Sequence, residues 1–267
     1  SRGGLATMSG TTGTDAHDGA TVDAAAVLAF VERSPAAVAQ YDRAAWVALF
    51  AADCVIEDPV GSRPHRAGDR GVIARFYDTF IAPNVIVFHR GRDFVDGLQV
   101  LRDLSIEIRM APRVAIRVPM YLVYELCREA GGLRIRRLAA HWELRPMLLQ
   151  LLRCGLRGLP PALALGLRMI RLQGLGGTLG FMRAWRSAGS TGKAAVIAAL
   201  AREEPALLPV ADAKVIAAGD HVTLRVSGAD VDGVFQAVTQ GPALQRRRCW
   251  TRAVNDCLRG GAAEPRC

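Results

Sequence analysis

The chain has 267 residues, 51% of them hydrophobic, and a formal net charge of +9 at pH 7. This length and hydrophobic content exclude a disordered protein and allow one large core or two smaller ones. The sequence contains no run of about eighteen uncharged apolar residues and no signal-peptide pattern. We therefore expect no membrane-spanning helix and a cytoplasmic location.

Six cysteines and five histidines are scattered along the sequence, with no C-x-x-C pair. Metal sites usually take such residues at closer and more regular spacings. We expect neither a metal site nor a cofactor, and cysteines that stay reduced in the cytoplasm.

The first part of the chain has a helical pattern. Residues 1–20 are small and polar, which favours a flexible leader. Over residues 21–50, apolar side chains recur at helical spacing, interrupted by Pro35 and by a polar turn at residues 40–43. We predict two helices here, the second capped by Asp42.

A short strand at residues 54–58 and a helix at residues 69–81 are predicted next. After Pro83 apolar residues alternate with polar ones, which is typical of strands. This alternation predicts three long antiparallel strands, at residues 98–110, 114–126 and 133–143.

The predicted short strand ends in two adjacent carboxylates, within the string VALFAADCVIEDPVGS at residues 47–62. Because strand side chains alternate between faces, Glu57 and Asp58 must lie in different environments. A carboxylate that points inward at a strand end is a candidate general base.

This string, followed by a helix that ends in Phe76-Tyr77, resembles the ketosteroid isomerases and the wider SnoaL-like branch of the nuclear transport factor 2-like superfamily. The resemblance covers residues 22–143. It implies an α+β fold, in which three N-terminal helices pack against a cone-shaped, curved antiparallel sheet. It also implies a homodimer, because this fold commonly pairs through its sheet.

The resemblance implies proton transfer next to the carbonyl of a polycyclic, steroid-like ketone that binds in an apolar pocket. Asp58 is at the position of the catalytic base. The alternative is an ordinary turn aspartate before Pro59 that binds backbone amides. In the family, hydrogen-bond donors stabilise the enolate oxygen that forms when the base takes its proton.

The donor positions match less well. The family's donor tyrosine falls on Ser34, which we interpret as a helix cap, so that donor is absent. The second donor falls on Tyr121, but a slip of one residue reverses the face of a strand and would place Met120 there. Tyr77 matches a tyrosine that supports the donors and is the alternative to Tyr121 as the donor itself, although it could equally be a half-buried core residue.

Several other residues are candidates for contact with the substrate. Phe50, Phe76 and Met120 would supply apolar surface, and His141 and Trp142 on the last strand would line the pocket mouth. For His141 the alternative is an ordinary sheet histidine with satisfied hydrogen bonds.

The sequence changes character after residue 143. Between residues 144 and 202 there is no acidic residue, whereas eight arginines and one lysine are present. The pattern of residues 144–186 predicts a basic amphipathic helical hairpin, divided at Pro160-Pro161. It could lie on an anionic membrane surface or serve as a lid or dimer clasp over the cone. Nucleic acid is not an expected partner, because leucines are abundant among the arginines and aromatic residues are few.

The remaining residues indicate a second, degenerate cone-like unit at residues 187–240. Val196-Ile197-Ala198 repeats Val72-Ile73-Ala74, and residues 213–226 and 231–238 have strand patterns. Residues 241–267 include three consecutive arginines and are expected to be a flexible tail. Because this fold has many functions, a non-catalytic ligand-binding or peripheral membrane-associated module is the alternative to an isomerase.

Overall fold

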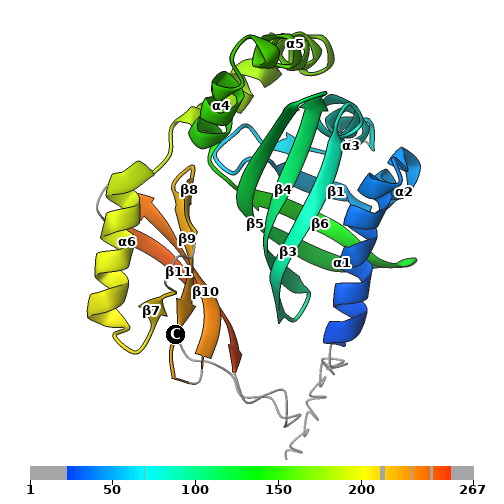
Figure 1. Ribbon diagram of the computed structural model, residues 1–267. Coiled ribbons are helices and arrows are strands. Elements are labelled where there is room, and N and C mark those ends of the chain that lie inside the picture. The colour runs from blue at the N-terminus through cyan, green and yellow to red at the C-terminus, as the bar shows by residue number, and fades with distance from the viewer. Residues whose placement is uncertain (1–22, 69, 211–213, 230, 241–242, 254–267) are drawn as a thin grey trace, which may run out of the picture.

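The computed structural model describes residues 23–68, 70–210, 214–229, 231–240 and 243–253. The predicted leader at residues 1–20 lies outside these ranges. The described chain forms a six-stranded sheet with helices, a helical hairpin at one end, and a second, smaller sheet with one helix (Figure 1).

Two helices open the fold, α1 (Ala24–Ala39) and α2 (Arg43–Ala48). Asp42 caps α2, because its side chain accepts a hydrogen bond from the amide of Ala45, as predicted. Pro35 does not end the first helix but lies inside it. Its buried neighbours Ser34 and Val38 keep this segment packed against the core, and that packing outweighs the hydrogen bond that proline removes.

The segment with the carboxylates forms β1 (Phe50–Glu57), which starts four residues earlier than predicted. A two-residue strand, β2 (His65–Arg66), pairs with it. The predicted helix at residues 69–81 appears as α3 (Arg70–Phe76), which continues as one π-helical turn, η1 (Tyr77–Ile81).

Four long strands follow and form the body of the cone. Their bounds are β3 (Val85–Asp96), β4 (Gln99–Ala111), β5 (Val114–Glu129) and β6 (Gly132–His141). The strand order is β2-β1-β6-β5-β4-β3. The expected α+β cone with three N-terminal helices is confirmed, with one difference: β1 runs parallel to β6, whereas the other pairs are antiparallel.

Both faces of the cone sheet are buried, which is clearest in β5. Met120, Leu122 and Tyr124 pack into the core inside the cone. The residues between them, Tyr121 and Val123, pack on the opposite face. Residues 120–124 therefore form a continuous buried run, in which hydrophobicity alone does not distinguish inside from outside.

A helical hairpin lies over one end of the cone, at the top of Figure 1. It consists of α4 (Leu144–Arg153), a 3-10 turn η2 (Gly155–Gly158) and α5 (Leu159–Met182). The two prolines occupy the first turn of α5, where a missing amide hydrogen costs little. Gly174, with φ 70°, kinks α5.

After a 3-10 turn, η3 (Arg183–Trp185), the second unit begins with α6 (Gly189–Glu203). Its strands are β7 (Leu208–Pro209), β8 (Val215–Ala218), β9 (His221–Ser227), β10 (Val231–Gln240) and β11 (Ala243–Ala253). Helix α6 covers one face of this sheet, through Val196 and Leu200 (Figure 1).

The prediction of a flexible tail from residue 241 is wrong for residues 243–253, which form β11 and pair with β10. Burial of Trp250, which is 3% exposed, stabilises this strand. The three arginines at 246–248 led to the wrong prediction, because a run of charged residues usually lies in a solvent-exposed, flexible segment. Residues 254–267 lie outside the described ranges.

The free face of the second sheet packs against the outer face of the cone sheet. Ile216, Ala218, Val234 and Trp250 share one cluster with cone residues, namely Val60, Phe94, Leu101, Tyr121, Val123 and Ala139. Lys214 pairs with Asp103 across this contact, with Nζ 2.6 Å from Oδ1. The chain's own second unit therefore covers the outer face of the cone sheet, whereas the resemblance implies a homodimer that pairs through its sheet.

An apolar cavity with one carboxylate

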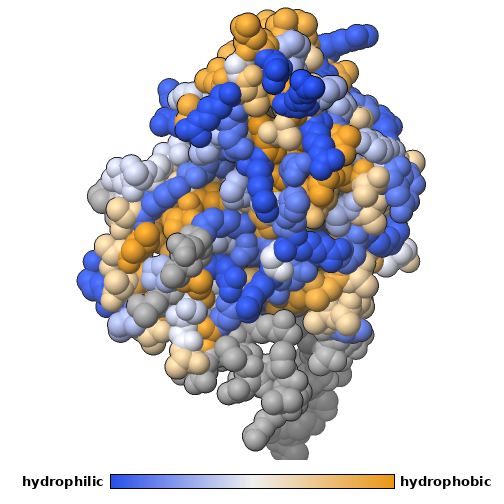
Figure 2. Space-filling view, viewed as in Figure 1, coloured by the Kyte–Doolittle hydropathy of each residue, from blue (hydrophilic) through white to orange (hydrophobic). Residues whose placement is uncertain are grey.

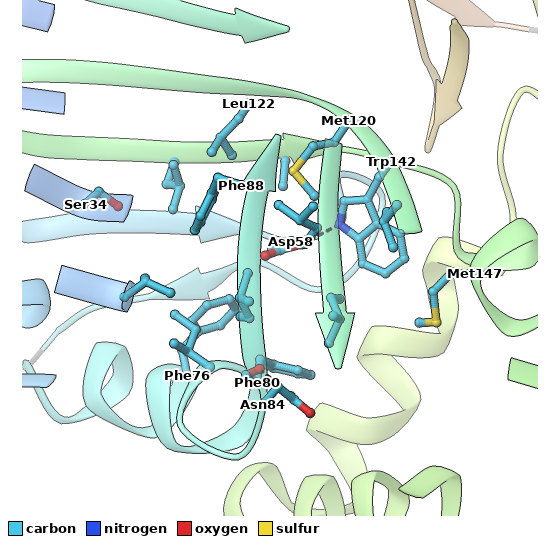
Figure 3. A pocket seen from close by; sticks show the side chains of 18 of the residues that line it. Ser34, Asp58, Phe76, Phe80, Asn84, Phe88, Met120, Leu122, Trp142 and Met147 are labelled. Atoms are coloured by element: carbon cyan, nitrogen blue, oxygen red, sulfur yellow. Dashed lines mark hydrogen bonds between the residues drawn. The ribbon is translucent and has the colours of Figure 1, made fainter. Parts of the chain in front are cut away.

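The cone encloses a cavity of about 140 Å³ that is lined almost entirely by apolar side chains. The polar lining side chains other than the two indoles are those of Ser34, Asp58, Asn84 and Tyr124. Asp58 is the only ionisable acid or base among the described lining residues apart from the phenol of Tyr124. Figure 3 shows its carboxylate in the middle of the cavity, among phenylalanine, leucine and methionine side chains.

The position of Asp58 follows from the pairing of two strands. Asp58 comes directly after β1, and Trp142 directly after β6, the parallel neighbour of β1. The amide of Val60 donates to the carbonyl of Ala140 at 2.9 Å, which holds the two strand ends together. The indole Nε1 of Trp142 can therefore donate a hydrogen bond of 2.5 Å to Oδ1 of Asp58 (Figure 3).

Burial raises the pKa of Asp58 from 3.8 to about 6, because the apolar surroundings disfavour the charged carboxylate. The hydrogen bond from Trp142 acts in the opposite direction and lowers the pKa. A carboxylate whose pKa lies near neutrality suits general base catalysis, because it is both ionised and basic enough to take a proton.

Of the five residues predicted to contact substrate, Phe76, Met120 and Trp142 line the cavity. Phe50 does not line it but packs behind it, with its ring 4.6 Å from that of Trp46. His141 faces the second unit, where its ring lies 5.4 Å from that of His221.

Neither predicted tyrosine donor lines the cavity. Tyr121 points out of the cone, and its hydroxyl donates to the carbonyl of Lys214 at 3.0 Å. Met120, the alternative to Tyr121 at the donor position, is the residue that faces the cavity. Tyr77 is 1% exposed, and its ring packs on that of Trp46 with centroids 5.5 Å apart.

The tyrosine that does line the cavity is Tyr124, which the sequence analysis missed. Its hydroxyl lies 3.5 Å from Oγ of Ser34, which also accepts a hydrogen bond of 3.2 Å from the indole of Trp46. Burial raises the pKa of Tyr124, so its hydroxyl stays protonated and can donate. Strand alternation could have found it, because Tyr124 shares a face with Met120.

The interpretation of Ser34 as a helix cap is also wrong. Ser34 lies within α1, and its hydroxyl faces the cavity beside Tyr124. The position that the resemblance assigned to a donor tyrosine thus has a serine of α1, and the tyrosine hydroxyl beside it comes from β5. The fourth polar residue, Asn84, donates its side-chain amide to the carbonyl of Phe80 at 2.9 Å.

The hairpin closes the end of the cavity opposite Ser34. Met147 of α4 and Leu165 and Phe181 of α5 line it, and Phe181 stacks on Phe80 with centroids 5.7 Å apart. Pockets for drug-sized ligands usually measure about 300–1,000 Å³. A molecule with several fused rings would therefore require the cavity to widen.

The described residues contain neither a metal-binding cluster nor a membrane-spanning helix. No three His, Cys, Asp or Glu side chains in these ranges lie close enough together to hold a metal ion. Likewise, no described helix is both long and apolar enough to cross a membrane.

Part of the cone matches a known family model. Residues 26–114 match the family model of the nuclear transport factor 2 domain. A search of curated proteins found none that matches the chain.

Among solved structures, a Delta 5-3-ketosteroid isomerase from Mycobacterium sp. is 27% identical, with 45% of this chain and 95% of that chain covered and a TM-score of 0.41. A Mycobacterium tuberculosis protein in complex with estradiol-17beta-hemisuccinate is 23% identical, with 45% and 95% covered and a TM-score of 0.40. An M. tuberculosis LEH-like epoxide hydrolase is 22% identical, with 51% and 92% covered and a TM-score of 0.41. The match of residues 26–114 to the nuclear transport factor 2 domain model agrees with the resemblance in the sequence.

Proposed function

We propose that the cone binds an apolar ketone with fused rings, of the steroid class, and that Asp58 moves a proton between two carbons near the carbonyl. One observation carries this proposal: a single carboxylate, with its pKa raised to about 6, lies in an otherwise apolar cavity. The motif around Asp58, which resembles that of the ketosteroid isomerases, supports the same chemistry.

The proton transfer has two steps. Oδ2 of Asp58 takes a proton from the carbon next to the carbonyl, and the electron pair of that C–H bond moves toward the carbonyl oxygen as an enolate forms. Asp58 then returns the proton to a different carbon of the enolate, and the carbonyl re-forms. The base ends as it began, so no co-reactant is needed.

Trp142 holds Oδ1 and leaves Oδ2 free to face the ligand. This hydrogen bond fixes the orientation of the carboxylate and favours its ionised form. Tyr124, with Ser34 beside it, is the proposed donor to the enolate oxygen, since its hydroxyl is the protonated phenol in the cavity. A donor that is already in place stabilises the charge as it develops.

Binding without catalysis is the second candidate. It is favoured by the hydroxyls of Ser34 and Tyr124, which lie 3.5 Å apart and can bond to each other instead of to a ligand. In that case the cone would carry an apolar molecule, and Asp58 would only position a polar group of the ligand.

The variant Asp58→Asn separates these functions. With a β,γ-unsaturated ketosteroid as substrate, we expect wild-type protein to form the conjugated ketone, and the variant to lose this activity by orders of magnitude while it still binds the steroid. The matched control is Glu57→Gln, because Glu57 pairs with Arg137 at 2.5 Å and does not line the cavity. Wild-type binding without turnover would support the carrier, and no binding at all would contradict both candidates.

A further inference from the structure

The hairpin of α4, η2 and α5 carries most of the exposed apolar surface of the described chain. Eleven of the thirteen large hydrophobic side chains that are exposed lie between residues 149 and 185. Figure 2 shows this region at the top of the molecule, where apolar side chains lie next to hydrophilic ones. A concentration of exposed apolar side chains marks an interaction site more often than isolated exposed leucines do.

The apolar residues of α5 lie on two sides of the helix. Leu165, Met169 and Phe181 face the cone, where Met169 is 4% exposed and the other two line the cavity. Leu163 and Leu167, one turn apart on the other side, are 65% and 59% exposed. The inward side is thus explained by packing on the cone, and the outward side has no partner among the described residues.

Arginines surround this outward apolar side. Arg153, Arg157, Arg171, Arg183 and Arg186 are exposed, and none of them forms an ion pair within the described ranges. No acidic residue occurs between residues 144 and 202 to balance them. The partner of this surface must therefore offer negative charge together with apolar groups.

These requirements distinguish the candidate partners. A second copy of the chain would bring the same arginines, so that like charges would face each other across the contact. Nucleic acid would offer phosphates but no apolar layer for the leucines. An anionic lipid bilayer offers both, with phosphate head groups above acyl chains.

We propose that the hairpin docks on anionic lipid membranes, with the outward leucines of α4, η2 and α5 inserted among the acyl chains and the arginines among the head groups. The helices would lie in the plane of the interface, since α5 contains Arg168, Arg171 and the kink at Gly174. The same helix closes the cavity from its other side, so a docked hairpin places this end of the cavity against the membrane. This last consequence rests on the proposed function, whereas docking itself does not.

The test is co-sedimentation of the full chain with vesicles of neutral phosphatidylcholine, with or without phosphatidylglycerol. We expect binding to the anionic vesicles only, and a decline as salt rises from about 50 to about 500 mM, because the attraction fades within a shorter Debye length. The triple variant Arg153→Gln, Arg157→Gln and Arg171→Gln should reduce the partition coefficient roughly a hundredfold. Leu163→Glu should reduce binding at every salt concentration, because it places a charge among the acyl chains.

The matched control is the triple variant Arg66→Gln, Arg113→Gln and Arg128→Gln, which removes the same charge from exposed sites on the cone. All substituted side chains are exposed, so the thermal midpoint of each variant should stay near that of the wild type. Equal loss with the control triple, equal binding to neutral vesicles, or no binding would overturn the proposal. The proposal would also be overturned if the wild-type chain forms a dimer in the absence of lipid and Leu163→Glu dissociates this dimer. Asp58→Asn should bind vesicles as the wild type does, so that failure of catalysis and failure of docking remain distinct.

Discussion

The indole nitrogen of Trp142 lies 2.5 Å from Oδ1 of Asp58, and the two residues come from the ends of two parallel strands. Within the described ranges, this is the one hydrogen bond to the carboxylate. It partly offsets the burial that raises the pKa of Asp58 to about 6. The ionisation of the proposed base therefore depends on a single neighbour.

Removal of that neighbour should raise the pKa of Asp58 further. In Trp142→Phe, burial persists but the hydrogen bond to the ionised form is lost. We expect the pH dependence of kcat/KM to move to higher pH, together with a lower rate at pH 6. Trp46→Phe is the control, since its indole bonds to Ser34 and not to Asp58. An unchanged midpoint in Trp142→Phe would show that the indole does not influence the base.

Asp58 should also destabilise the folded protein at neutral pH. Its pKa is about 6 in the folded state and near 3.8 when unfolded, so the folded state binds more protons between these values. Stability therefore falls as pH rises from about 4 to about 6, by at most about 3 kcal/mol. Asp58→Asn should lack this loss and unfold at a higher denaturant concentration than the wild type at pH 7. The difference should shrink at pH 4, and a variant that is less stable at both pH values would contradict the burial argument.

Replacement of Tyr121 and replacement of Tyr124, the two tyrosines of β5, should have very different effects on kcat. Tyr124→Phe removes the proposed donor from the cavity and should lower kcat by roughly a hundred- to a thousandfold. Tyr121→Phe should leave kcat unchanged, because its hydroxyl bonds to Lys214 on the other face of the sheet. A large loss in Tyr121→Phe and none in Tyr124→Phe would mean that Tyr121, and not Tyr124, is the donor in the cavity.

The contact between the two units depends on two glycines. A Cβ on Gly61 would lie 2.5 Å from the Cα of Gly219, so Gly61→Ala should push the second unit away from the cone. We expect a loss of stability above about 1 kcal/mol, with about 2 to 4 °C lost from the melting temperature for each kcal/mol. Gly97→Ala is the control, because Gly97 also has positive φ but no atom within 4 Å of the added Cβ. Equal losses in both variants would show that backbone strain, and not the clash, is the cause.

The part of this site that depends on residues adjacent in the sequence could be predicted, and the part that depends on distant residues could not. The string around Asp58 is continuous, and it places the carboxylate after a strand that the structure contains. The donor was misplaced because residues 120–124 are buried on both faces, so apolar character could not decide between Met120 and Tyr121. That burial comes from the second unit, which contacts the cone through residues more than ninety positions away, as in the bond from Tyr121 to Lys214. Trp250 and its strand were missed because arginines precede them.

The most direct test of the central claim is the pH dependence of ketosteroid isomerisation by the wild-type chain. If Asp58 is the base, kcat/KM should rise with pH through one ionisation near pH 6 and then level off, as the carboxylate loses its proton. The small residual activity of Asp58→Asn should lack this step. No turnover at any pH, or a rate that is independent of pH between about 4 and 8, would contradict the account.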